Sequence, residues 1–96
     1  MKKIYRVEQE NNFNGGIFDF TNCDEAVRTL TKILHDEANY HYNINKDNTY
    51  SICEVNVINE DEYEYEEEYF DTLISISVKD YRDMSADEKE KIGLKY

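Results

Sequence analysis

The chain has 96 residues, of which 40% are hydrophobic and 14% aromatic, enough for one modest core and too few for two. Its 22 acidic and 11 basic residues give a net charge of −11, a sign that repels nucleic acids and anionic membranes. We therefore expect one folded domain over residues 1–96 that binds neither. The apolar runs are too short to span a membrane, and the amino terminus lacks the apolar segment of a signal peptide, which predicts a cytosolic protein.

The first predicted element is a strand over residues 2–9, "KKIYRVEQ", which carries Ile4, Tyr5 and Val7. The "NGG" at residues 14–16 can supply the positive φ of a tight reversal. A short second strand, "GIFDF", is then expected over residues 16–20.

A helix follows, and its start has two possible registers. Asn22 with Glu25, or Thr21 with Asp24, places a capping side chain before an acid that complements the helix dipole. Apolar residues recur at three- and four-residue spacing and predict one buried helical face: Ala26, Val27, Leu30, Ile33, Leu34 and Ala38. The helix is expected to end within residues 40–43, before the turn-rich "NINKDN".

Two long strands are predicted next, over residues 49–59 and 71–81. The first strand places the odd-numbered Cys53, Val55 and Val57 on one face. The second strand places even-numbered residues on one face, namely Thr72, Ile74, Ile76 and Val78. An antiparallel hairpin pairing Val57 with Ile76 and Val55 with Val78 would bring both sets against the helix, with the chain reversing within residues 65–68.

The acidic run "NEDEYEYEEEYFD" at residues 59–71 lies at the far end of this hairpin. In an extended chain the even-numbered acids would form a carboxylate row with about 6.8 Å between neighbours; these are Glu60, Glu62, Glu64, Glu66 and Glu68. Tyr63, Tyr65 and Tyr69 would line the opposite face. A helix over residues 62–73 is the alternative, because the tip lacks Gly, Pro and Asn and because Glu favours helices.

A short terminal helix is predicted after Ser85, which forms a capping box with Glu88, and Gly93 marks its end. The whole pattern predicts an α+β fold. An antiparallel sheet, built from the N-terminal strand or hairpin and the long C-terminal hairpin, packs on one main helix.

Sequence motifs for catalysis or for cofactors are missing. Cys23 and Cys53 form no CxxC pattern and are expected to be buried thiols. His35 and His41 do not share a helical face well, and no metal motif surrounds them. The acids are so dense that we expect them to be solvated, whereas catalytic acids need burial. The chain is therefore expected to be no enzyme and to hold no cofactor or metal.

The acidic run has two interpretations. It can be a solvated face that keeps the protein soluble and protects the hairpin edge. It can also be a docking surface for a basic site on another protein, since tyrosine is enriched at interface hot spots. The candidate partner-binding residues are Glu60, Asp61, Glu62, Tyr63, Glu64, Tyr65, Glu66, Glu67, Glu68, Tyr69 and Asp71.

The small size, the acidity and the segment "YEYEEEYFDTLISISVKDYR" at residues 63–82 resemble the phage-encoded anti-CRISPR proteins, which cover the DNA-binding sites of RNA-guided nucleases. The resemblance implies a nucleic-acid mimic whose partner is a basic nucleic-acid-binding protein, either a nuclease or a CRISPR effector. It also implies which side chains enter the basic channel: Glu64, Glu66, Glu67, Glu68 and Asp71. An immunity or antitoxin-like protein that neutralises a basic toxin, and a non-enzymatic acidic adaptor, are the alternative functions.

Overall fold

The fold was obtained as a computed structural model that describes residues 2–10, 18–40, 48–61 and 63–94. Its elements follow one another as β1 (Lys2–Gln9), β2 (Phe18–Phe20), α1 (Cys23–Tyr40), β3 (Thr49–Glu60), β4 (Tyr65–Ser77), α2 (Val78–Asp83) and α3 (Ala86–Lys91). The predicted reversal at residues 14–16 lies outside the described residues. None of the described helices is long and apolar enough to cross a membrane.

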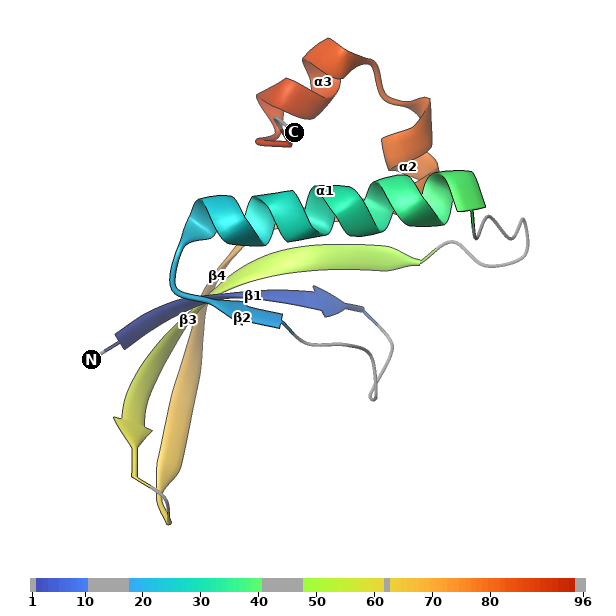
Figure 1. Cartoon of the computed structure of the whole chain (residues 1–96). Helices are drawn as coiled ribbons and strands as arrows, with labels where there is room; N and C mark the ends of the chain where they lie inside the picture. Colours follow the sequence, from blue (N-terminus) through green and yellow to red (C-terminus); the bar gives the residue numbers. More distant parts are fainter. Residues whose placement is uncertain (1, 11–17, 41–47, 62, 95–96) are drawn as a thin grey trace.

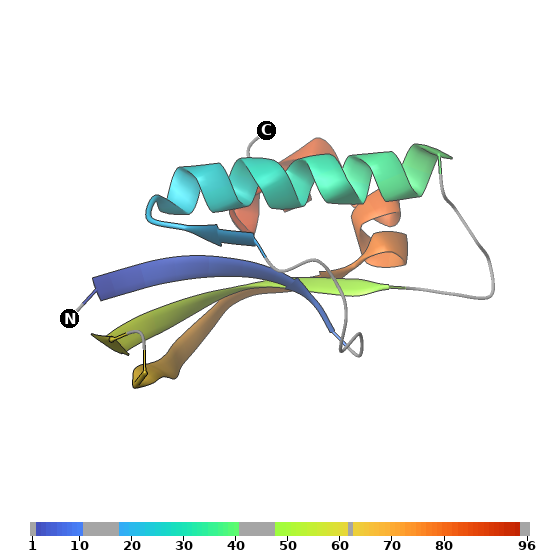
Figure 2. The same ribbon diagram turned by 60° about the horizontal axis from the view of Figure 1, so that its bottom comes forward.

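The four strands form one antiparallel sheet in the order β2-β1-β3-β4. Helix α1 lies across one face of the sheet, and α2 and α3 lie beside it on the same side (Figures 1 and 2). The predicted α+β class is confirmed, with two helices after the sheet in place of one.

Helix α1 begins and packs as its sequence predicts. The Asn22 carboxamide oxygen accepts the backbone N–H of Asp24 at 2.8 Å, which satisfies a donor that the first turn leaves unpaired. Ala26, Leu30 and Leu34 are fully buried against the sheet, in the positions that the apolar spacing predicts. Such helix-to-sheet burial supplies most of the stability of a single small core.

The hairpin between β3 and β4 confirms the strand prediction for the acidic run and excludes the helix over residues 62–73. The predicted register is wrong. Ile76 pairs with Tyr50, and Val57 pairs with Glu67 instead of Ile76. The chain reverses after Glu60 and before Tyr65, earlier than predicted, and three register shifts separate the two halves of the ladder.

The reason for the wrong register is that β3 buries both of its faces. Tyr50 and Ile52 belong to the core beneath α1. Cys53, Val55 and Val57 form a second buried cluster with Ile4 of β1, and by strand alternation this cluster lies on the face away from α1. The prediction that Val55 and Val57 pack against the helix is therefore wrong.

The chain leaves β4 earlier than the alternation of residues 72–78 predicts. Ser77 caps α2 by accepting the backbone N–H of Asp80 at 3.1 Å, so Val78 and Tyr81 are buried from a helix and not from a strand. The capping box at Ser85 and Glu88 is confirmed by the N–H of Glu88, which donates to the Ser85 hydroxyl at 3.2 Å.

Candidate functional site

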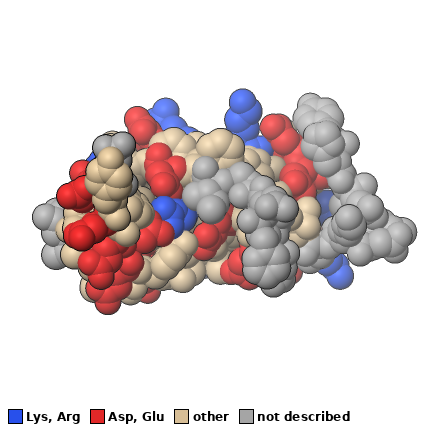
Figure 3. Space-filling view, turned by 90° about the horizontal axis from the view of Figure 1, so that it is seen from below, with Lys and Arg blue, Asp and Glu red and all other residues tan. Residues whose placement is uncertain are grey.

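The acidic run forms the end of the β3–β4 hairpin that extends away from the helices (Figure 1). We call residues 55–71 the distal hairpin. It contains eight acidic residues and no lysine or arginine. Five of the eight large hydrophobic side chains that are exposed in the described part of the chain also lie here: Ile58, Tyr63, Tyr65, Tyr69 and Phe70. Seen from below, acidic side chains gather at this end of the molecule (Figure 3).

The even-numbered carboxylate row does not form, because the chain reverses between Glu60 and Tyr65. Glu60 lies on β3 while Glu66 and Glu68 lie on β4, and Glu64 is in the turn region between them. Glu62 lies outside the described residues. On β4 the alternation holds, since Tyr65, Glu67 and Tyr69 share the face that the Arg6 side chain also occupies.

The tip of the hairpin is ordered by short polar side chains. The N–H of Asp61 donates to the Asn59 carboxamide oxygen at 2.9 Å, and the N–H of Tyr63 donates to the Asp61 carboxylate at 3.1 Å. Asp61 therefore acts as a turn residue. Tyr63 is 88% exposed, the most exposed of the large hydrophobic side chains described.

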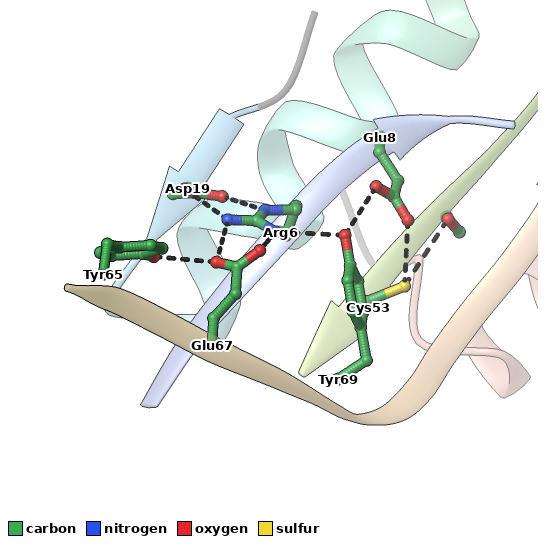
Figure 4. Close-up of polar contacts among 8 residues, drawn as sticks. Arg6, Glu8, Asp19, Cys53, Tyr65, Glu67 and Tyr69 are labelled. Carbon is green, nitrogen blue, oxygen red and sulfur yellow. Dashed lines mark hydrogen bonds and ion pairs between the residues drawn. The ribbon is translucent and has the colours of Figure 1, made fainter. Parts of the chain in front are cut away.

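Arg6 of β1 is the centre of a polar network on the face away from α1 (Figure 4). Its side chain is 9% exposed, and all five of its N–H donors are used. Two bind Asp19 at 2.8 and 3.2 Å, two bind Glu67 at 2.6 and 2.9 Å, and one binds the Tyr69 hydroxyl at 3.1 Å. Both carboxylates are held in the paired geometry that makes arginine contacts strong.

The positions of these two carboxylates show how the sheet curls. Asp19 belongs to β2 and Glu67 to β4, which are the two edge strands. One guanidinium reaches both, and the distal hairpin bends away from α1 (Figure 1), so the face away from α1 is concave around Arg6. The register shifts in the β3–β4 ladder supply that bend, since bulges sharpen the local twist. Arg6 thus fixes the position of the distal hairpin relative to the rest of the sheet.

The electrostatics follow from these contacts. Hydrogen bonds from Arg6 hold the pKa of Glu67 below its ordinary value, and hydrogen bonds to Glu67 and Asp19 raise the pKa of Arg6. The Tyr65 hydroxyl donates to Glu67 at 2.8 Å, which raises the pKa of that phenol. Arg6 and Tyr65 therefore stabilise the ionised carboxylate of Glu67. Arg6 itself has no remaining N–H with which to bind an anionic ligand.

The network continues from Tyr69 to a buried thiol. The Tyr69 hydroxyl donates to Glu8 at 3.3 Å, and the Cys53 thiol donates to the same carboxylate at 3.5 Å. Burial raises the pKa of Cys53, so the reactive thiolate is disfavoured. Cys53 is buried, as predicted, whereas Cys23 is half-buried, and both are free thiols.

The remaining acids of the distal hairpin differ in whether a lysine of β1 forms an ion pair with them. Glu60 is paired with Lys2 at 3.3 Å. Lys3, which is bound to Glu54 at 3.0 Å, lies over the Phe70 ring at 5.8 Å. Glu64, Glu66, Glu68 and Asp71 are all exposed, and none of them forms an ion pair within the described part of the chain.

The structure therefore separates the predicted site residues into two groups. Glu67 and Tyr69 are held by Arg6, Tyr65 is held by Glu67, and Asp61 orders the tip. Glu64, Glu66, Glu68 and Asp71 are available to a partner. Sequence reasoning missed Arg6, Asp19 and Glu8. Arg6 did give one signal, because it is a charged residue between the apolar Tyr5 and Val7, where a buried charge requires partners.

No described group of three or more His, Cys, Asp or Glu side chains is arranged to hold a metal ion. His35 is exposed and lies 3.9 Å from Asp36, while His41 is outside the described residues. Comparisons of the chain with protein-family models, with curated proteins and with solved structures find no match.

Proposed function

We propose that the protein is a stoichiometric inhibitor and not an enzyme, acting in the cytosol as a phage-type anti-defence protein. Its distal hairpin mimics nucleic acid and occupies the basic DNA- or RNA-binding site of a nuclease or CRISPR effector. The observation that carries the proposal is the coincidence of two unusual features on one hairpin. Unneutralised acids and exposed aromatic side chains occur together there.

Each feature has a role in such a complex. Glu64, Glu66, Glu68 and Asp71 would replace phosphates against lysine and arginine side chains, and this attraction accelerates association. Tyr63 and Phe70, 88% and 67% exposed, offer rings that can stack where bases stack on a nucleic-acid-binding surface. Exposed aromatic rings do not increase solubility, so a surface that only kept the protein soluble would not need them.

The Arg6 network supports the proposal in a different way. Binding is weakened when an interface must be ordered on contact, so a prearranged surface gains affinity. Arg6 ties the hairpin to β2, and the hydrogen bonds of Asp61 order the tip. The exposed acids of the hairpin, which are Glu64, Glu66, Glu68 and Asp71, therefore lie on a backbone that is already ordered before binding.

The test is affinity capture from a bacterial lysate on the immobilised protein, followed by mass spectrometry. The proposal expects captured proteins to be nucleic-acid-binding proteins, and duplex DNA or guide RNA to displace them. Capture of a toxin that does not bind nucleic acid would instead support an immunity protein. Binding that neither nucleic acid nor salt displaces would overturn the mimicry.

A further inference from the structure

The outer edge of β4 is the longer of the two open edges of the sheet. β4 stands at the end of the strand order and pairs with β3 alone among the described strands. It has 13 residues, whereas β2 at the opposite edge has three. An edge strand presents unpaired backbone N–H and C=O groups to which a strand from another chain can bind.

The alternation of hydrogen-bonded pairs between β3 and β4 shows which backbone N–H and C=O groups of β4 point toward the open edge. The N–H of Val78 donates to the Asn48 carbonyl at 2.9 Å, so this pair is of the hydrogen-bonded type. In an antiparallel ladder the two pair types alternate, and Ile76 and Ile74 therefore also direct their backbone groups toward β3. Ser75 lies between them, so its N–H and C=O point toward the open edge.

A groove of about 470 Å³ lies beside this edge. Its lining is formed by Leu73, Ile74, Ser75 and Ile76 of β4, together with Asp80, Met84, Lys91 and Ile92 from the C-terminal helical segment. Alternate residues of a strand point to opposite faces, so four consecutive residues line a groove only where it follows the strand edge. The groove therefore gives an added strand both backbone partners and a wall on which apolar side chains lie beside Asp80 and Lys91.

We propose that an extended segment of the partner protein binds along the edge of β4 as an additional strand. This rests on the function proposed above and specifies how the partner is held. From residue 65 to residue 77, β4 carries Glu66, Glu67, Glu68 and Asp71 and no basic residue. Side chains on neighbouring strands approach within about 5.5 Å, so the segment should carry Lys or Arg at alternate positions near Glu66 and Glu68. Apolar residues would enter the groove.

A second copy of this chain fits the edge less well. Each copy carries a net charge of −11, and strands that paired through their acidic halves would place carboxylates opposite one another. A basic strand meets complementary charge along residues 66–71, the acidic half of the same edge. The occupant that the charges favour is therefore a basic segment of another protein.

The test uses a fluorescein-labelled peptide of eight residues that alternates lysine and valine, with binding followed by fluorescence anisotropy. Ser75→Pro removes one outward N–H while leaving the ladder with β3, because proline is tolerated at the outer side of an edge strand. Ser75→Ala is the matched control, since both changes remove the hydroxyl that donates to Glu10 at 2.9 Å. A peptide of the same sequence, N-methylated at alternate residues, keeps the charge and loses backbone donors.

The peptide is expected to bind the wild-type chain and Ser75→Ala equally, and Ser75→Pro at least tenfold more weakly. N-methylation is expected to weaken binding to the wild-type chain by a similar factor. Equal affinity of the two peptides would overturn strand addition, and this comparison holds even if the proline variant fails to fold. A wild-type dimer that Ser75→Pro converts to a monomer would assign the edge to a second copy and overturn the proposal.

The outcome also separates this inference from the proposed function. Suppose that Glu64→Lys, Glu66→Lys and Glu68→Lys together abolish binding of a captured nuclease while Ser75→Pro leaves it unchanged. Acidic docking then stands and strand addition is wrong. If neither change affects the captured partner, both proposals fail.

Discussion

Replacement of Arg6 by methionine tests whether one buried guanidinium fixes the distal hairpin. Methionine keeps an unbranched apolar stem and removes all five N–H donors, which leaves Asp19 and Glu67 without their cation. Removing one partner of a buried ion pair costs roughly 3–5 kcal/mol. The carboxylates here are 42% and 25% exposed, so water can recover part of this loss. We expect a loss of about 2–3 kcal/mol in the free energy of unfolding.

Urea unfolding followed by far-ultraviolet circular dichroism measures this loss. For a domain of this size the same loss corresponds to a fall of about 10–20 °C in Tm. The double variant with Arg6→Met and Glu67→Gln should lose less than the sum of the single variants, because the second change removes the charge that the first left unpaired. A loss below about 1 kcal/mol for Arg6→Met, or strictly additive losses, would refute the reasoning.

Three further predictions concern Glu67, Leu34 and Cys53. The Arg6 contacts hold the pKa of Glu67 below its ordinary value, so their stabilisation is complete above the unfolded pKa of about 4.5 and is lost as the pH falls through the folded pKa. The stability advantage of the wild-type chain over Glu67→Gln should therefore shrink in urea titrations below about pH 4.5, and a constant difference would contradict this. Leu34 is fully buried between α1 and the sheet, so Leu34→Ala should cost about 2–5 kcal/mol in the same assay, and a loss below 1 kcal/mol would contradict this packing of α1. Cys53 should react with Ellman's reagent at pH 8 only as the chain unfolds, and rapid labelling of a Cys23→Ala variant under native conditions would contradict its burial.

Local signals in the sequence were sufficient for most elements. The bounds of β1, the Asn22 cap of α1 and the Ser85 cap of α3 each follow from residues that are close together in the sequence. Such local patterns do not depend on which strands become neighbours. The Ser77 cap of α2 has the same form, with Asp80 three residues on, but residues 72–78 also alternate like a strand, and this pattern predicts the wrong element.

The register of the hairpin could not be predicted from alternation, because alternation assumes one buried face. β3 buries Ile52 on the side that faces α1 and Val55 on the other side, where the sheet curls. Arg6 holds that curl by contacting two edge strands that are far apart in sequence. The same contact separates Glu67, which Arg6 binds, from the exposed acids of the distal hairpin.

The central claim is that the outward acids of the distal hairpin form the docking surface. It is tested most directly by measuring how strongly a captured nucleic-acid-binding partner binds two charge-reversed variants over a range of salt concentrations. The first reverses Glu64, Glu66 and Glu68 to lysine and spares Glu67, which the fold requires. The second reverses three exposed acids of α1 and α3, Glu25, Asp87 and Glu90, and changes the net charge by the same amount.

The claim predicts that the hairpin variant loses at least a hundredfold in affinity together with most of its salt dependence, while the helix variant stays within a few-fold of the wild-type chain. Equal losses in the two variants would show that net charge alone drives the binding. Full retention by the hairpin variant would show that the partner binds elsewhere.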